Sequence, residues 1–241
     1  LIAQSNLATD YKGQLVVRYP ELSATIIVLS IFQFIFIDPP FIFSFWIWLI
    51  SAVCLAFIFR KYITSFWLNF WLIMIFLFVL SSADNLLLQA SRTERWLMLG
   101  LSFFGMVYGT YILSSSRKND VREKRILYFI AFVVLLQAAS MFFNIIGRFN
   151  LSKTLLATGY VGVIIAILFL FSARLINEGL GLASEIYKHP DRKLFFLNFD
   201  RVGEKVPAIF YALLIIGWFI LIGRNFYSFK LITSPFNDFL F

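Results

Sequence analysis

The chain has 241 residues, of which 61% are hydrophobic and 14% are charged. Soluble globular domains are about 45–50% apolar and about 25% charged, so this composition excludes an ordinary water-soluble fold. The formal net charge is +8, from 21 Lys and Arg against 13 Asp and Glu. These basic residues are spread over the stretches between apolar segments, which fits loops beside an anionic membrane surface and argues against nucleic-acid binding.

Seven apolar segments follow a polar stretch at residues 1–21, and together they predict an all-α, polytopic membrane domain over residues 22–241. A helix needs about 20 apolar residues to cross a hydrocarbon core about 30 Å thick. Their long apolar runs lack the alternation of membrane β-strands. The expected spans, paired as hairpins, are Leu22–Ile37, Phe41–Phe59, Ile63–Leu80, Trp96–Leu113, Ile126–Ile146, Leu155–Leu175 and Pro207–Ile222. The first is short, and it is either a full crossing or a re-entrant or tilted helix.

Turn-forming residues separate these segments. The prolines of Asp38-Pro39-Pro40 follow the first segment, and Pro207 opens the seventh, a position where proline removes no intrahelical hydrogen bond. Residues 176–206 mix Leu and Phe with basic side chains, which is typical of a segment in the headgroup layer. We therefore expect an interfacial hairpin there, with a plain solvated loop as the alternative.

Basic residues also predict the orientation, because loops rich in Lys and Arg stay on the cytoplasmic side. About 15 of the 21 basic residues fall on the side of the N-terminus, which is therefore expected in the cytoplasm, with Phe241 outside. The chain begins without Met and ends on an apolar run, so we expect a piece of a longer protein. The basic residues expected to meet lipid headgroups are Arg60, Lys61, Arg117, Lys118, Arg122, Lys124, Arg125, Lys193 and Arg201.

Small and neutral polar residues within the segments predict contacts between helices. Gly105 and Gly109 form a GxxxG pair, which puts both glycines on one helix face and lets a neighbouring backbone approach. The expected helix-packing residues are Gly100, Gly105, Gly109, Gly159 and Gly162. Neutral polar side chains cost energy against lipid, so they are expected to hydrogen-bond to another helix or, alternatively, to line a substrate path. They are Gln33, Asn69, Gln137 and Asn144.

Groups for catalysis or metal binding are sparse. His189 is the only histidine and Cys54 the only cysteine, and no zinc-type spacing or Gly-rich phosphate loop is present. The sequence places no ionisable residue inside a span: Asp84 lies just past the third segment and Glu178 on the polar end of the sixth. Ion-coupled transporters and membrane enzymes usually carry such groups, so we expect neither enzymatic activity nor a cofactor or metal.

Three stretches in the C-terminal half carry a family resemblance. They are Asn150–Tyr160 (NLSKTLLATGY), Asn198–Pro207 (NFDRVGEKVP) and Ile222–Tyr227 (IGRNFY). Over Arg148 to Phe241 the chain resembles the accessory transmembrane region of large bacterial MscS-type mechanosensitive ion channels. The resemblance implies a location in the bacterial inner membrane and a role in osmotic stress. It also implies a homo-oligomer, namely a heptamer, with a pore domain elsewhere in the same longer chain. The family's Gly- and Ala-rich pore helix and β-rich cytoplasmic domain are absent from this sequence, so no pore or gate residue is assigned.

The function that fits is a membrane-embedded, lipid-contacting paddle, meaning the helices outside the pore, which couples bilayer tension to gating. Two alternatives stay open: part of a polytopic transporter, or of a membrane enzyme acting on lipid-linked substrates. A transporter often shows an inverted repeat between its halves. The first three segments do not match the last three in length, glycine placement or polar placement.

Overall fold

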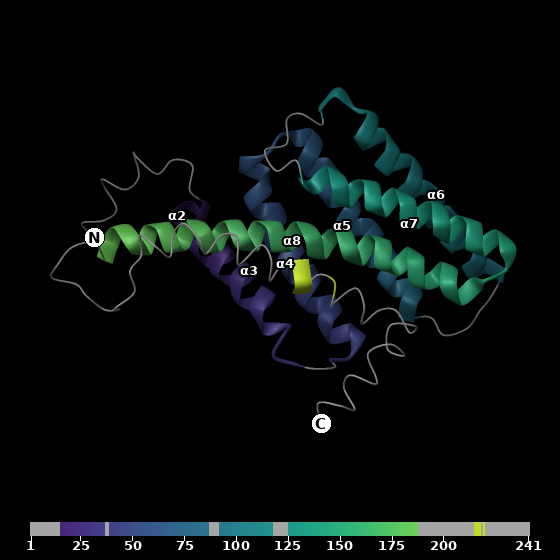
Figure 1. The fold of residues 1–241 in the computed structure, drawn as a ribbon, viewed down its shortest axis with the longest axis horizontal. Coiled ribbons are helices and arrows are strands. Elements are labelled where there is room, and N and C mark those ends of the chain that lie inside the picture. Colours follow the sequence, from purple (N-terminus) through teal and green to yellow (C-terminus); the bar gives the residue numbers. More distant parts are fainter. Residues whose placement is uncertain are drawn as a thin grey trace. The chain divides into compact units, whose positions relative to one another are not determined.

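The computed structural model describes residues 15–36, 39–86, 92–117, 125–187, 215–217 and 219, and every regular element among them is a helix (Figure 1). The all-α fold class is thus confirmed for this part of the chain. In chain order the elements are α2 (Leu15–Arg18), α3 (Pro20–Phe32), α4 (Phe41–Tyr62), α5 (Ser65–Leu86), α6 (Arg92–Ser114), α7 (Arg125–Ile146) and α8 (Phe149–Tyr187).

Five of these helices, α4 to α8, are long and apolar enough to cross a membrane. Their apolar stretches have 20 to 34 residues. A helix rises 1.5 Å per residue, so each can reach across a core about 30 Å thick. They correspond to the second to sixth predicted segments and indicate a membrane-embedded protein. The seventh segment, Pro207–Ile222, lies almost entirely outside the described residues, as does most of the hairpin expected at residues 176–206. A count of seven spans therefore stays a prediction.

The first predicted segment forms a shorter helix than expected. α3 begins at Pro20 and ends at Phe32, and its 13 residues cover about 20 Å, less than the thickness of the hydrocarbon core. The chain turns at residues 33–36. Gln33 caps this end of α3: its amide nitrogen donates to the carbonyl of Ser30 at 2.9 Å, and its amide oxygen accepts from the indole of Trp48 at 2.8 Å.

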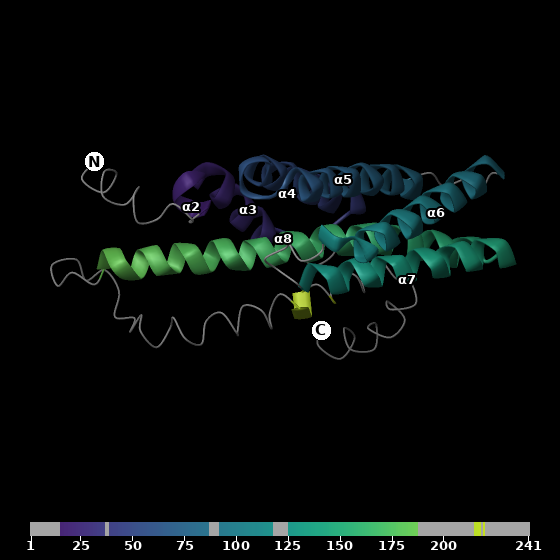
Figure 2. The same ribbon diagram turned by 90° about the horizontal axis from the view of Figure 1, so that it is seen from above.

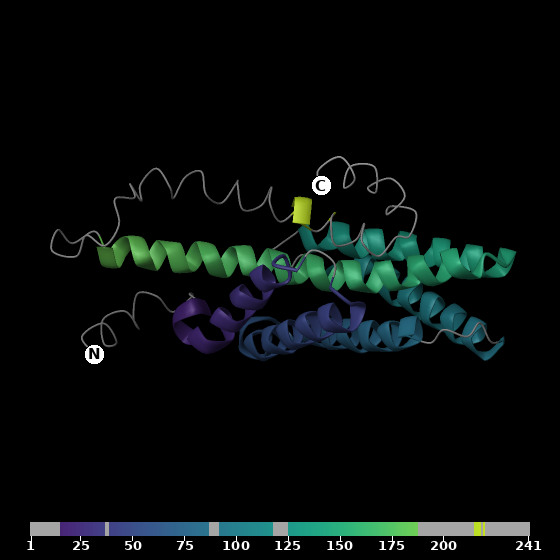
Figure 3. The same cartoon turned by 90° about the horizontal axis from the view of Figure 1, so that it is seen from below.

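Two compact units divide the chain. One comprises Leu1–Lys61 with Leu168–Ile215, and the other comprises Tyr62–Ile167 with Ile216–Phe241. α8 contributes its C-terminal part to the first unit and its N-terminal part to the second. Figure 3 shows α8 as one continuous helix, and its 39 residues make it longer than the predicted Leu155–Leu175 at both ends.

The first unit holds α2, α3 and α4 against the C-terminal part of α8. The Glu178 carboxylate accepts a 2.7 Å bond from the backbone N–H of Leu15 at the start of α2, which satisfies a donor that the helix itself leaves unpaired. Arg174 donates to the same carboxylate at 3.0 Å. Apolar packing adds to these bonds: the rings of Phe59 and Phe171 lie 4.6 Å apart between centroids.

The second unit is built around α6 and α7, which run antiparallel to each other (Figure 2). Contacts between them match decreasing residue numbers in α6 with increasing numbers in α7. The pairs are Gly109 with Val134, Gly105 with Gln137, Ser102 with Ser140, and Arg95 with Asn144. The N-terminal part of α8 packs against both helices, and α5 contacts α6.

Candidate functional site

A row of buried serines joins α6, α7 and α8 in the second unit. Ser102 donates to the Ser140 hydroxyl at 3.0 Å, and Ser140 donates in turn to the backbone carbonyl of Ser152 at 2.8 Å. Ser152 returns a 2.8 Å bond to the carbonyl of Ser140. All three residues are at most 1% exposed. Each of these hydroxyls thus donates a hydrogen bond within the protein, which is needed because lipid tails offer no acceptor.

Tyr160 provides a second polar link between α8 and α6. Its ring is fully buried, and its hydroxyl donates to the backbone carbonyl of Leu101 at 2.8 Å. A β-carbon at Gly105 would overlap that hydroxyl. In α7, the Gln137 amide donates to the carbonyl of Leu156 at 3.3 Å and lies against Gly159.

The glycines expected to pack helices have different environments. A β-carbon at Gly109 would lie 2.5 Å from a methyl carbon of Val134, and one at Gly159 would lie 2.5 Å from the amide nitrogen of Gln137. At Gly105 and Gly109 the close approach of the helices depends on glycine, because a β-carbon would meet a ring hydroxyl or a methyl group. At Gly159 it would meet only the movable end of the Gln137 side chain. Gly162 is also buried. Gly100 is exposed, and a β-carbon there would meet open space, so this position makes no helix contact.

Three ionisable side chains gather at one end of the second unit. Lys153, in the first turns of α8, donates to the Glu94 carboxylate of α6 at 2.6 Å, and their side chains are 15% and 4% exposed. Asp84, near the end of α5, is 2% exposed and lies within electrostatic range of both. Among the described residues, neither Asp84 oxygen has a hydrogen-bond partner.

The position of Asp84 corrects the expectation that no ionisable residue lies inside a span. α5 does not end near Leu80 but continues to Leu86, and the candidate span reaches Asp84. Ser81 and Ser82 are only 1% and 2% exposed. The local drop in hydropathy therefore marks a polar part of the protein interior, not the start of a loop.

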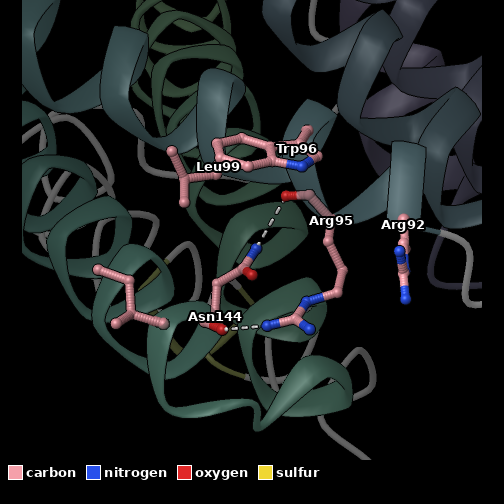
Figure 4. Close-up of a pocket in the computed structure, with 6 residues that line it drawn as sticks. Arg92, Arg95, Trp96, Leu99 and Asn144 are labelled. Atoms are coloured by element: carbon pink, nitrogen blue, oxygen red, sulfur yellow. Dashed lines mark hydrogen bonds between the residues drawn. The ribbon is translucent and has the colours of Figure 1, made fainter.

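A pocket with a cavity volume of about 300 Å³ opens between the start of α6 and the end of α7 (Figure 4). The residues that line it are Arg92, Arg95, Trp96, Leu99, Asn144 and Ile145. Arg95 donates to the backbone carbonyl of Asn144 at 3.1 Å, and the Asn144 amide donates back to the carbonyl of Arg95 at 3.2 Å. This reciprocal pair fixes one guanidinium at the pocket wall.

The pocket combines positive charge with apolar walls. Arg92 and Arg95 stand in the first turn of α6, where the helix dipole adds to their charge. Trp96 and Ile145 are 74% and 64% exposed. Such a site suits an anion that carries an apolar chain. The pocket was not predicted from the sequence, although two arginines beside Trp96 at the start of a span were an available signal.

The basic residues predicted to meet lipid headgroups are only partly described. Arg60 and Lys61 are exposed in the last turn of α4. Arg117 is exposed, with its guanidinium 5.4 Å from the ring centroid of Phe66, and its carbonyl accepts a 3.3 Å bond from the Trp67 indole. The remaining positions have side chains outside the described residues: Lys118, Arg122, Lys124, Arg125, Lys193 and Arg201.

Three of the four neutral polar residues noted in the sequence contact another segment. Gln33 bonds to Trp48, Gln137 to Leu156 and Asn144 to Arg95. Asn69 is instead exposed on α5. The three contacts fit the role of hydrogen bonds that hold helices together in lipid.

Comparisons of the chain with protein-family models, with curated proteins and with solved structures find no match. In the described part of the chain, no three His, Cys, Asp or Glu side chains are grouped to hold a metal ion. The lone Cys54 is half-buried in α4. Function is therefore argued from the geometry of the helices, the charged cluster and the pocket.

Proposed function

We propose that this chain is the lipid-contacting transmembrane paddle of an MscS-type mechanosensitive ion channel, which transmits bilayer tension to a pore formed elsewhere in the protein. The three C-terminal sequence stretches support the family. One structural observation carries the mechanical part: the second unit is held by internal hydrogen bonds, while its outer faces carry large apolar side chains.

The outer faces of α6 and α7 suit contact with acyl chains. Their large apolar side chains are between 47% and 78% exposed, and they are Trp96, Leu97, Phe103, Phe104, Val107, Tyr111, Tyr128, Leu135, Phe142, Ile145 and Ile146. In water, such a surface promotes aggregation or partner binding. Lipid tails solvate it without cost, so in a bilayer the same side chains form an uneven surface that acyl chains pack against.

The interior of the second unit suits the transmission of force. Lipid supplies no hydrophobic drive for helix association, so close packing and hydrogen bonds hold membrane helices together. Here the serine row, Tyr160 and the Glu94–Lys153 pair bind α6, α7 and α8 to one another. A unit with such internal bonds passes a displacement of its lipid-facing surface to whatever it is joined to, because close-packed interiors deform little.

The pocket supplies a polar point of attachment for lipid. A phosphate group between Arg92 and Arg95 would gain charge-assisted hydrogen bonds, and the apolar wall of Trp96, Leu99 and Ile145 would take the start of an acyl chain. A lipid held in this way moves with α6 and α7, so tension in that leaflet acts directly on the unit. By the expected orientation, this is the leaflet opposite the cytoplasm.

The experiment that tests the proposal is patch-clamp recording of the full-length parent protein in liposomes under stepped suction. We expect currents that open only with tension, and a changed tension threshold when the helices of this chain are deleted from a channel that still folds and assembles. An unchanged threshold in that deletion contradicts the paddle role. A silent membrane, with folded and inserted protein, contradicts the channel family as well.

The charged cluster favours a second candidate, an ion-coupled transporter. Ionisable residues within membrane helices commonly mark ion or proton paths. Asp84, Glu94 and Lys153 supply two carboxylates and an amine at the end of the second unit. The transporter reading predicts ion-driven uptake that Asp84→Asn abolishes and that membrane tension does not change. The paddle reading predicts a tension threshold and no such uptake.

A further inference from the structure

Asp84 is a buried carboxyl group that receives no hydrogen bond from the residues that the structure describes. Its residue is 2% exposed, and both of its oxygens are buried and unpartnered. A carboxylate taken out of water without donors is strongly disfavoured, and such a group generally becomes neutral instead. Asp84 ends the candidate span from Ser65 to Asp84, and its burial against the protein keeps bulk water from its oxygens.

The neighbouring charges do not balance Asp84. Lys153 lies within electrostatic range of Asp84 but gives its short contact, 2.6 Å, to Glu94. With all three groups ionised, two carboxylates and one ammonium leave this cluster with a charge of −1. A single added positive charge makes the cluster neutral, which is the state that a low-dielectric environment favours.

Other charged groups on the adjoining, described elements give Asp84 no hydrogen bond either. On α6, Arg95 donates to the carbonyl of Asn144, and Arg92 is exposed at the pocket. Arg148, just before α8, is exposed. Asn144, the polar residue near the end of α7, is neutral. None of these side chains donates a hydrogen bond to an Asp84 oxygen.

Two neighbouring hydroxyls lie in the same polar part of α5. Ser81 and Ser82 are buried, and both hydroxyl oxygens lack hydrogen-bond partners. Ser81 precedes Asp84 by three residues, so both side chains lie on one face of the helix. A hydroxyl there can accept a proton from a neutral carboxyl group or donate to an ionised one.

We infer that Asp84 binds one proton, so that the cluster of Asp84, Glu94 and Lys153 is neutral within the membrane-embedded unit. The proton resides on an Asp84 oxygen, and Glu94 keeps its 2.6 Å contact with Lys153. A metal cation is the less suitable ligand: it needs several oxygen ligands at once, and the Lys153 ammonium repels it, whereas a proton needs one oxygen.

The test is infrared difference spectroscopy of the protein in liposomes, recorded between acidic and alkaline buffers. We expect a carbonyl band of a protonated carboxyl group that shifts in heavy water and is lost in Asp84→Asn. Glu21→Gln removes an exposed carboxyl group at the start of α3 and is the matched control, in which the band remains. A band of equal intensity in wild type and Asp84→Asn overturns the inference.

Two further measurements distinguish a bound proton from a bound metal ion and from an ionised Asp84. Replacing sodium with choline tests a metal ion: the band is expected to stay unchanged, and a band that appears only without sodium overturns the inference. Thermal unfolding tests the state of the carboxyl group, because Asn has the shape of a neutral Asp. Asp84→Asn is expected to unfold at the wild-type temperature near neutral pH. A marked fall in its unfolding temperature would show that the folded protein needs the ionised carboxylate, and it would overturn the inference.

Discussion

The hydroxyl group of Tyr160 occupies the place that a β-carbon on Gly105 would take, so α8 comes this close to α6 only because position 105 is glycine. The same hydroxyl donates to the carbonyl of Leu101, one turn earlier in α6, at 2.8 Å. One aromatic side chain thus combines a steric fit with a hydrogen bond across two helices of the second unit.

Replacing Gly105 by Ala is therefore expected to destabilise the protein. The added methyl group forces Tyr160 to move in a packed interior, which costs about 1–3 kcal/mol in the free energy of unfolding. Gly100→Ala, on the same helix, is the control, because a β-carbon there meets open space and Ala favours a helix by about 1 kcal/mol over Gly. Unfolding of the two variants in detergent measures the difference. Equal effects at both positions would contradict the close approach of α8 and α6.

The contact between Gly105 and Tyr160 also predicts non-additive effects. Tyr160→Phe alone loses one buried hydrogen bond, which averages about 0.6 kcal/mol within membranes. In the double variant Gly105→Ala/Tyr160→Phe, the hydroxyl that the new methyl group meets is gone. The double variant is therefore expected to be more stable than the sum of the single effects implies, by about 0.5 kcal/mol or more. Strict additivity in this cycle would show that the two side chains do not touch.

Ser140 connects three helices, and its replacement by Ala tests the serine row. The substitution removes the acceptor for Ser102 and the contacts with both the carbonyl and the hydroxyl of Ser152, and the Ser102 hydroxyl loses this partner. We expect a loss of about 1–2 kcal/mol in the free energy of unfolding. Thr110→Ala is the control, since its exposed hydroxyl bonds only within α6, to Met106. A similar cost in both variants would contradict a structural role for the row.

The sequence predicted the five long apolar helices of the described residues because each is a continuous apolar run. The ends of the helices were less predictable, since polar residues there are buried against protein rather than exposed in loops. Ser81 and Ser82 lowered the hydropathy after Leu80, yet α5 continues to Leu86. At Gln33 the opposite happened: α3 ends at Phe32 inside an apolar run, and Gln33 bonds to Ser30 and Trp48.

The candidate site was only partly readable from the sequence. GxxxG spacing identified Gly105 and Gly109 as contact positions, because spacing fixes which residues share a helix face. It could not show that Gly100 faces open space, which depends on where the neighbouring helix lies. The pair of Glu94 and Lys153 joins residues 59 positions apart and depends on the register of α6 against α8, for which no local pattern exists.

That ion pair yields a prediction of its own. Lys153→Met leaves the Glu94 carboxylate buried without its partner, and breaking one member of a buried pair costs about 3–5 kcal/mol. The double variant Glu94→Gln/Lys153→Met removes both charges and is expected to be the more stable of the two. The free energy of unfolding of the single and double variants decides the matter. A double variant less stable than Lys153→Met would contradict a buried pair in which each charge is stabilised by the other.

The pocket beside α6 predicts retention of an anionic phospholipid. A basic side chain near an anionic lipid contributes about 1 kcal/mol, so Arg92→Gln is expected to weaken binding about fivefold. Arg95→Gln is expected to weaken it further, because the guanidinium fixed by Asn144 is then absent. Native mass spectrometry with phosphatidylglycerol measures the bound lipid, and inorganic phosphate as a competitor distinguishes the headgroup alone from the whole lipid. Arg60→Gln, at an exposed position of α4, is the control.

Lipid retention that falls equally in all three variants would point to a general effect of surface charge and contradict a specific pocket. Loss confined to Arg92 and Arg95, with weak competition by phosphate, would instead show that the apolar wall of Trp96, Leu99 and Ile145 adds to the binding.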